Sequence, residues 1–317
     1  LRVDDYDSWT YETRLARGVI GAMRTSFDGT KVAMGSSDGS IRILSLPELE
    51  LQRILVGQTS INSIRWVTEQ SLVATCDDGR ACLWSVDSGE ILRTWACPGV
   101  PALDADIAYD GAYAAVASPS SPGALRSLSR EVKEASAFTP GWSGAVAWAP
   151  NDSRLAISQD GAVSIFVDHG STLVSWLDEG MESVIGLEWD PTGRWLAASA
   201  ISLDRAYLID GSSGQIVHQV SLTPAHDCSC RWSPDGHRVA FSGQQQVVIH
   251  DTRTHEDHSI AFPMSTLNSF DWIDGETLLC QASGEEGLTR ISVSDGHLAR
   301  IGLMFFSTMT HLRTADR

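Results

Sequence analysis

One motif in the chain matches the pattern that surrounds a nucleophilic serine. Residues 35–39 read GSSDG, which fits the G-x-S-x-G elbow. That chemistry needs a strand-to-helix turn, with an acid and a histidine further along the chain. Here the motif lies between two segments that alternate like β-strands, as do the similar stretches CDDGR and SQDGA. We therefore interpret Ser37 as a turn residue and predict no catalytic residue.

Metal-ligating and thiol side chains gather at two other places. Residues 250–258, HDTRTHEDH, carry imidazoles and carboxylates that could hold a divalent ion. Their spacing in a polar hairpin fixes no ligand geometry, so a solvated turn is the simpler interpretation. Cys228 and Cys230 lie two apart on an expected strand and point the same way, and we interpret them as buried apolar side chains. No metal and no other cofactor is predicted.

Charge and composition exclude several classes of partner. The chain of 317 residues has a formal net charge of −17, which repels nucleic-acid phosphates and anionic membrane surfaces. It has no apolar run near the ~18 residues of a membrane span, and no signal peptide is visible at its start. Its six cysteines include no CxxC pair, so we expect a reducing, cytoplasmic location. We expect a monomeric domain, free-standing or part of a larger chain.

A repeated unit organises the sequence. The tight turn of SPDG, at Asp235–Gly236, has equivalents at intervals of 39 to 43 residues along the chain. Four residues after most of these turns stands an alanine, and a small residue at a fixed strand position indicates that neighbouring sheets approach closely. Just before the turn, five of the seven units place a tryptophan at the same position, which we interpret as a core layer: Trp66, Trp148, Trp189, Trp232 and Trp272.

The repeat predicts the fold. Each unit divides into four short apolar segments separated by polar turns, and no helical period competes with this pattern. Units of ~40–45 residues with four antiparallel strands close radially into a propeller. We predict an all-β, seven-bladed β-propeller of four-stranded antiparallel blades, forming a single domain over residues 1–317.

The limits of the blades follow from the same register. An alternating segment at 8–16 is expected to pair with the last blade and close the ring, in competition with HLARIGL at 297–303. Residues 304–317 are expected to form a tail. The units are expected at 18–57, 58–97, 98–139, 140–179, 180–222, 223–262 and 263–303.

Several of these segments resemble a known family. LWSV at 83–86, the preceding turn DDGR and the SPDG-type turns are similar to WD40-repeat propellers, and the resemblance covers about Val19 to Leu303. No Gly-His pair opens any unit and the Trp-Asp ending is mostly lost, so the His–Asp network of regular WD40 blades is expected to be missing from most blades. WSPDGHRVAF also resembles the TolB-type propeller repeat.

Charges of both signs occupy one position of the innermost strand, directly before the tryptophan position. Each charge has an opposite charge in one neighbouring unit, and this pairing makes burial tolerable. Acids and arginines in a channel could also form an active site, but we favour the structural role. The predicted inter-blade ion pairs are Arg24–Asp271, Arg65–Asp106 and Glu188–Arg231, with Ala147 in unit four.

The resemblance implies that the loops between the second and third strands, and those between units, emerge on one face. These loops carry acidic side chains and a few apolar ones without a core position, which suits a basic or amphipathic peptide. Alternatively, solvated turns share the acidic bias of the chain without any functional role. The predicted partner-binding residues are Asp38, Asp78, Trp142, Asp160, Met181, Asp204, His226, Phe262, Glu285 and Glu286.

Two functions are compatible with these observations. The first is a non-catalytic scaffold or sensor domain that recognises a protein or peptide on the loop face. The second is a propeller-fold enzyme, such as a lyase, cyclase or hydrolase, acting on a small molecule in the central channel. An enzyme needs convergent polar groups left unpaired in a pocket, and the predicted pairing of the channel charges favours the first function.

Overall fold

The structure is a computed structural model in which most of the chain is described. The described residues are 19–57, 59–96, 101–118, 124–127, 143–159, 162–167, 171–177, 184–201, 204–225, 228–262, 267–282 and 287–301.

These residues form antiparallel sheets whose strands pair in chain order. Units one and two contain β1 (Ile20–Thr25), β2 (Lys31–Ser36), β3 (Ser40–Ser45), β4 (Leu51–Val56), β5 (Ile61–Thr68), β6 (Ser71–Cys76), β7 (Arg80–Ser85) and β8 (Ile91–Ala96). Units three and four contain β9 (Asp104–Ile107), β10 (Tyr113–Ala117), β11 (Ala124–Ser127), β12 (Ser143–Trp148), β13 (Leu155–Gln159), β14 (Ala162–Val167) and β15 (Ser171–Leu177). Units five and six contain β16 (Val184–Trp189), β17 (Trp195–Ala200), β18 (Arg205–Asp210), β19 (Ile216–Ser221), β20 (Cys230–Trp232), β21 (Arg238–Gly243), β22 (Gln246–Asp251) and β23 (Glu256–Ala261). Unit seven contains β24 (Leu267–Trp272), β25 (Thr277–Ala282), β26 (Leu288–Ser292) and β27 (Leu298–Ile301).

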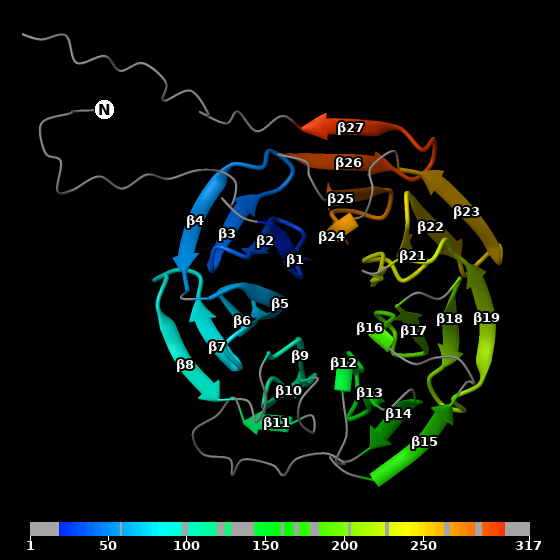
Figure 1. The fold of residues 1–317 in the computed structure, drawn as a ribbon, viewed down its shortest axis with the longest axis horizontal. Coiled ribbons are helices and arrows are strands. Elements are labelled where there is room, and N and C mark those ends of the chain that lie inside the picture. The colour runs from blue at the N-terminus through cyan, green and yellow to red at the C-terminus, as the bar shows by residue number, and fades with distance from the viewer. Residues whose placement is uncertain are drawn as a thin grey trace, which may run out of the picture.

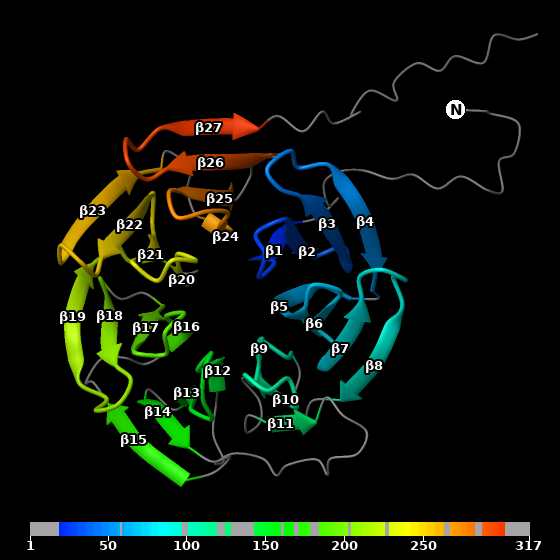
Figure 2. The same cartoon turned by 180° about the vertical axis from the view of Figure 1, so that it is seen from behind.

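The sheets stand around a common centre as the blades of a propeller (Figure 1). The first strand of each unit lies innermost and the last strand lies at the periphery, and the view from behind shows the same order (Figure 2). The prediction of four-stranded blades is confirmed for six units, whereas unit three has three strands among the described residues. The part of unit three that follows β11 falls largely in 128–142, outside the described residues.

Tight turns and close packing explain why the units form blades. The turn between the first and second strands places Gly29 and Gly236 in the left-handed region, at φ of 69° in both, which glycine adopts without a steric penalty. The alanines four residues beyond these turns are fully buried, as Ala33 and Ala240 show, where neighbouring sheets meet. Each main apolar cluster joins side chains of two adjacent units, so the core lies between blades.

The first and last units contact each other directly. The backbone N–H of Thr25 donates to Asp271 Oδ2 over 2.7 Å, and the Thr25 hydroxyl donates to the carbonyl of Trp272 over 2.8 Å. Met23 and Met34 of unit one pack with Leu279 and Leu288 of unit seven. The predicted closing strand at 8–16 lies outside the described residues, and the outer place of unit seven is taken by β27. Among the described residues, no helix is long and apolar enough to cross a membrane.

Candidate functional site

Two cavities occupy opposite ends of the inner strands. The first, of about 510 Å³, is lined mainly by residues at the starts of these strands, such as Ser63 and Ser229. The second, of about 630 Å³, is lined by the strand ends and the turns that follow them, such as Trp148 and Pro234. Arg24 and Arg65 line both cavities, so they mark the level at which the two meet.

The predicted charge ring lies at this level. Arg65 Nε lies 3.2 Å from Asp106 Oδ1, and the pairs Arg24–Asp271 and Arg231–Glu188 are each 4.0 Å apart. The shortest contact of Arg24 was not predicted: its Nη1 reaches Glu188 Oε1 of unit five at 3.1 Å, across the ring.

A fourth carboxylate, also missed by the sequence analysis, joins the ring. Asp104 lies two residues before Asp106, and its Oδ1 lies 3.4 Å from Arg65 Nη2. Two residues along a strand point to the same face, so this position could have been found from the pattern.

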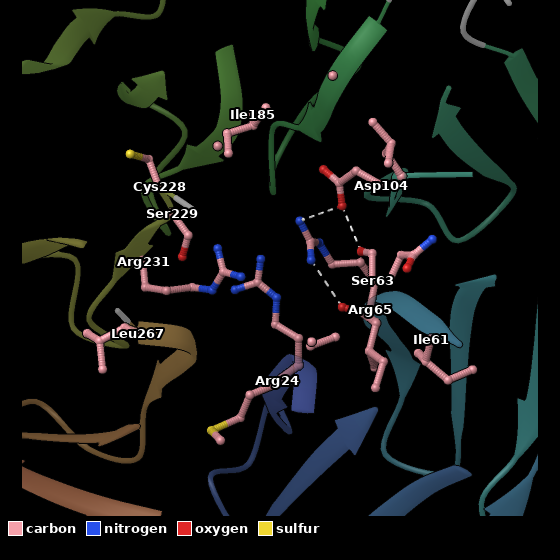
Figure 3. A pocket seen from close by; sticks show the side chains of 18 of the residues that line it. Arg24, Ile61, Ser63, Arg65, Asp104, Ile185, Cys228, Ser229, Arg231 and Leu267 are labelled. Atoms are coloured by element: carbon pink, nitrogen blue, oxygen red, sulfur yellow. Dashed lines mark hydrogen bonds and ion pairs between the residues drawn. The ribbon is translucent and has the colours of Figure 1, made fainter. Parts of the chain in front are cut away.

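Charges in the ring are close to balanced in number, with three arginines and four carboxylates, but they are unevenly paired in space. Figure 3 shows Arg24 and Arg231 directed toward each other in the first cavity, opposite the Arg65–Asp104 pair. Arg24 is 7% exposed, and its Nε and Nη2 have no hydrogen-bond partner among the described residues, nor has Nε of Arg231. Burial, together with the positive charges of Arg231 and Arg65, lowers the pKa of Arg24 to about 10. Arg24 therefore keeps its charge at neutral pH but is incompletely compensated.

The carboxylates of the ring also hold the backbone of the next unit. Asp106 Oδ2 accepts the N–H of Trp148 over 2.7 Å, and Glu188 Oε2 accepts that of Trp232 over 3.2 Å. Asp271 accepts the N–H of Thr25 in the same way. Burial raises the pKa of Asp106 and of Asp271, against the lowering effect of the arginines. These contacts support a structural role for the acids.

Indole rings form a second set of links between units. The Nε1 of Trp66 donates to the carbonyl of Arg24 over 3.0 Å, and Trp232 donates to the carbonyl of Glu188 over 3.0 Å. Trp189 and Trp272 make equivalent bonds to Ala147 and Arg231. The tryptophan position, interpreted from the sequence as apolar core, thus also supplies a hydrogen-bond donor to the preceding unit.

The predicted partner-binding residues are only partly described. Asp38 lies 3.6 Å from Arg42, and Asp78 Oδ2 accepts Nε of Arg80 over 2.6 Å, so both carboxylates hold their own turns. Asp204 is exposed beside Arg205. Six other predicted partner-binding residues lie outside the described residues: Trp142, Asp160, Met181, His226, Glu285 and Glu286.

One member of that set was assigned incorrectly. Phe262 was expected on the surface, but it is 2% exposed and packs against Ile260 and Leu267 in the core between units six and seven. The residue directly after β23 turns inward here, and its N–H donates to the carbonyl of Gln245. Phe262 is therefore a core residue and not a partner-binding residue.

Exposed apolar side chains lie instead at the second cavity. Phe27 and Tyr109 line it and are 73% and 54% exposed. Pro150, Pro191 and Pro234 occupy corresponding places in units four to six, and all three are exposed. The signal was present in the sequence, because these residues directly precede the Asp-Gly-type turns used to find the repeat. We call this set the apolar rim.

Other sequence motifs have structural roles. Ser37 lies in the turn between β2 and β3, and its Oγ accepts the N–H of Val19 over 3.0 Å. Cys228 and Cys230 are buried thiols, as interpreted.

Comparisons with known proteins agree with this architecture. Residues 49–85 match the family model described as WD domain, G-beta repeat. No curated protein sequence matches the chain. The structure is similar to the crystal structure of the Cps50 (Swd1) β-propeller domain of Myceliophteria thermophila, with a TM-score of 0.71 and 16% sequence identity, over 90% of this chain and 96% of that one. At this identity, the likeness shows the fold alone, which is that of a β-propeller.

Proposed function

We propose that this WD40-like propeller is a non-catalytic interaction module that binds a segment of a partner protein at the second cavity. The WD40 fold is typical of protein–protein interaction scaffolds. The observation that carries the proposal is the exposure of Phe27 and Tyr109 at the rim of a cavity of about 630 Å³. Aromatic side chains exposed around a concavity are typical of binding surfaces and contribute strongly to affinity when a partner covers them.

Charge defines the chemistry of the proposed partner. The lining of the second cavity includes five acidic residues and two arginines, and both arginines are engaged with carboxylates of the ring. Asp28 and Asp274 lie exposed among the apolar rim. A segment with an aromatic or aliphatic side chain next to a Lys or Arg would fill the cavity and complement these charges. We therefore propose a basic, partly apolar peptide segment as the ligand.

The enzyme alternative receives less support from the described residues. Asp106, Glu188 and Asp271 each accept a backbone N–H of the next unit and each lies near an arginine. A general acid or base must be able to reach a substrate proton, and these carboxylates are already committed to the fold.

The location of binding can be tested without knowing the natural partner. A phage-displayed library of random linear peptides would be selected on the immobilised protein, and the selected peptides measured by fluorescence anisotropy. We expect peptides that combine Lys or Arg with aromatic residues. Their affinity should fall at least about ten-fold in a Phe27→Ser/Tyr109→Ser variant, and should weaken as salt screens the rim charges.

Matched variants distinguish the two faces. Ile91→Ser removes an apolar side chain that is 44% exposed on the outer strand β8, and should leave affinity unchanged. Trp142→Ala tests the loop face predicted from the sequence. Loss of binding in Trp142→Ala with full binding in the Phe27/Tyr109 variant would move the site to that face. Failure to select any peptide from the library would reject the peptide-binding function.

A further inference from the structure

We propose that His218, His250 and Asp257 form a binding site for a divalent transition metal of the Zn²⁺ class, between units five and six. One ligand atom from each of these residues lies within 4.8 Å of the other two. His250 Nδ1 is 2.7 Å from Asp257 Oδ1, and His218 Nε2 is 3.1 Å from both oxygens of the same carboxylate. Two imidazoles and a carboxylate are the donor set that Zn²⁺ takes in proteins.

The fold brings these residues together from two units. His250 on β22 and Asp257 on β23 are direct partners in the antiparallel register of unit six. His218 comes from β19, the outer strand of unit five, which lies next to unit six at the periphery (Figure 1). The sequence pattern HDTRTHEDH pointed to one loop. In the structure only His250 and Asp257 of that motif belong to the cluster, and the third member, His218, lies 32 positions before His250. Asp251 is instead engaged by Arg238 and Arg253.

The cluster combines one buried side chain with two partly exposed ones. The side chain of His250 is 0% exposed, and its Nε2 has no hydrogen-bond partner among the described residues. The side chains of His218 and Asp257 are about one-third exposed, so an ion can reach the cluster from solvent. One side of the proposed site is therefore fixed in the core, and the other side remains accessible.

The protons of the two rings must be accounted for. Both rings donate an N–H to Asp257 in the hydrogen-bonded arrangement, and a metal ligand needs the lone pair of that nitrogen. On binding, a neutral ring moves its proton to its other nitrogen, while a protonated ring releases one proton. For His250 the other nitrogen is the buried Nε2, and a buried N–H without an acceptor is unfavourable. We therefore expect weaker binding than at a dedicated structural zinc site.

Ring orientation sets a second condition. The imidazoles of His218 and His250 are stacked, with centroids 4.2 Å apart and planes inclined by 25°, so the two rings lie side by side and are not turned toward one common point. Coordination requires the ring of His218 to turn, and its partial exposure leaves room for this. His250, held in the core, keeps its place. Water would complete the tetrahedral coordination.

A bound ion would link the peripheries of two units. The hydrogen bonds between units described above lie at the inner strands, and the His218–Asp257 contact lies at the outer edge. Metal binding to the folded state alone stabilises it in proportion to the logarithm of the free metal concentration. Zn²⁺ should therefore raise the melting temperature.

The experiment is a thermal melt of the purified chain, stripped with chelator and titrated with Zn²⁺, Mg²⁺ or Ca²⁺. We expect Zn²⁺ to raise the melting temperature by a few degrees when it exceeds its dissociation constant about 100-fold. Mg²⁺ and Ca²⁺, which prefer oxygen ligands, should have no such effect. Co²⁺ titration followed by its visible absorption band reports coordination independently of stability.

Single substitutions decide between a metal site and a hydrogen-bonded histidine pair. His218→Ala and Asp257→Asn should abolish the Zn²⁺ shift and the Co²⁺ band. His258→Ala removes an exposed imidazole one position along β23 and should retain both. Absence of a Zn²⁺ effect in the unsubstituted chain would overturn the proposal, as would an undiminished shift and Co²⁺ band in His218→Ala and Asp257→Asn. Peptide binding at the apolar rim is expected to be independent of all three substitutions.

Discussion

Glu188 occupies the most connected place in the charge ring, so its charge should matter for stability. Its carboxylate lies 3.1 Å from Arg24 and 4.0 Å from Arg231, and it accepts the backbone N–H of Trp232. Glu188→Gln preserves the size of the side chain and its ability to accept that N–H. The substitution removes one negative charge from between two guanidiniums, and leaves Arg24 with Asp271 as its remaining close carboxylate at 4.0 Å.

The expected magnitude follows from burial. Removing one partner of a fully buried ion pair destabilises a protein by about 3–5 kcal/mol, because the other charge stays buried and uncompensated. The Arg24 side chain is 8% exposed but that of Glu188 is 25% exposed, which allows partial screening by water. We therefore expect Glu188→Gln to lower the free energy of unfolding by about 2–3 kcal/mol.

Urea unfolding followed by tryptophan fluorescence measures this change, in a double-mutant cycle with Arg24→Met. If the two charges stabilise each other, the double variant should be more stable than the sum of the single effects predicts, by about 1–2 kcal/mol. Asp204→Asn is the control, because its exposed pair with Arg205 should contribute less than about 1 kcal/mol. A loss below about 0.5 kcal/mol in Glu188→Gln, or single effects that simply add, would refute the structural interpretation of the ring.

Three further substitutions test other parts of the structure. Arg231→Ala should lower the melting temperature and leave peptide affinity unchanged in the anisotropy assay, whereas lost binding at an unchanged melting temperature would give Arg231 a functional role. Trp232→Phe keeps an aromatic ring but removes the indole donor to the carbonyl of Glu188, and should cost about 1 kcal/mol in urea unfolding because a part-buried hydrogen bond between units is lost. Asp210 accepts hydrogen bonds from the hydroxyl of Ser212 and the backbone N–H of Ser213, which lower its pKa to about 2. Its stabilisation is complete above the unfolded pKa of about 3.9 and is lost as pH falls toward 2, so Asp210→Asn should flatten the acid side of the stability profile, and an unchanged slope would contradict this assignment.

The blade architecture could be predicted because the residues that define each blade recur at a nearly fixed interval along the sequence. The alanine and tryptophan positions recur in register with the turns, so one alignment of the units locates the strands. The neighbouring partners in the charge ring follow from the same alignment. The contact between Arg24 and Glu188 does not, because it crosses the ring between units one and five and depends on the reach of two long side chains.

Contacts at the surface were harder to predict for a related reason. His218 and His250 meet only because β19, the outer strand of unit five, runs close to β22 of unit six, a distance that the repeat does not specify. Phe262 illustrates the opposite error, since a residue at a strand end was assumed to be exposed although its backbone turns it into the core. The apolar rim was visible in the alignment, but its residues were treated as part of the turn that defined the register.

Two units lack one of the side chains that link neighbouring blades, and each is joined to its neighbour by another contact. Ala147 of unit four offers no charge, yet its carbonyl accepts the indole N–H of Trp189, so the link to unit five uses the backbone. Unit three has Ile107 at the tryptophan position and therefore no indole to offer unit two. There the Arg65–Asp106 ion pair makes the connection.

The last and first units are also joined at their inner strands, but the donor there is a threonine. Thr25 stands where most units have tryptophan, and its hydroxyl and N–H bind Trp272 and Asp271. Each neighbouring pair of units is thus joined at the inner strand by a carboxylate, an indole or a hydroxyl. Where the charge is missing, at Ala147, an indole makes the link, and where the indole is missing, at Ile107, an ion pair makes it.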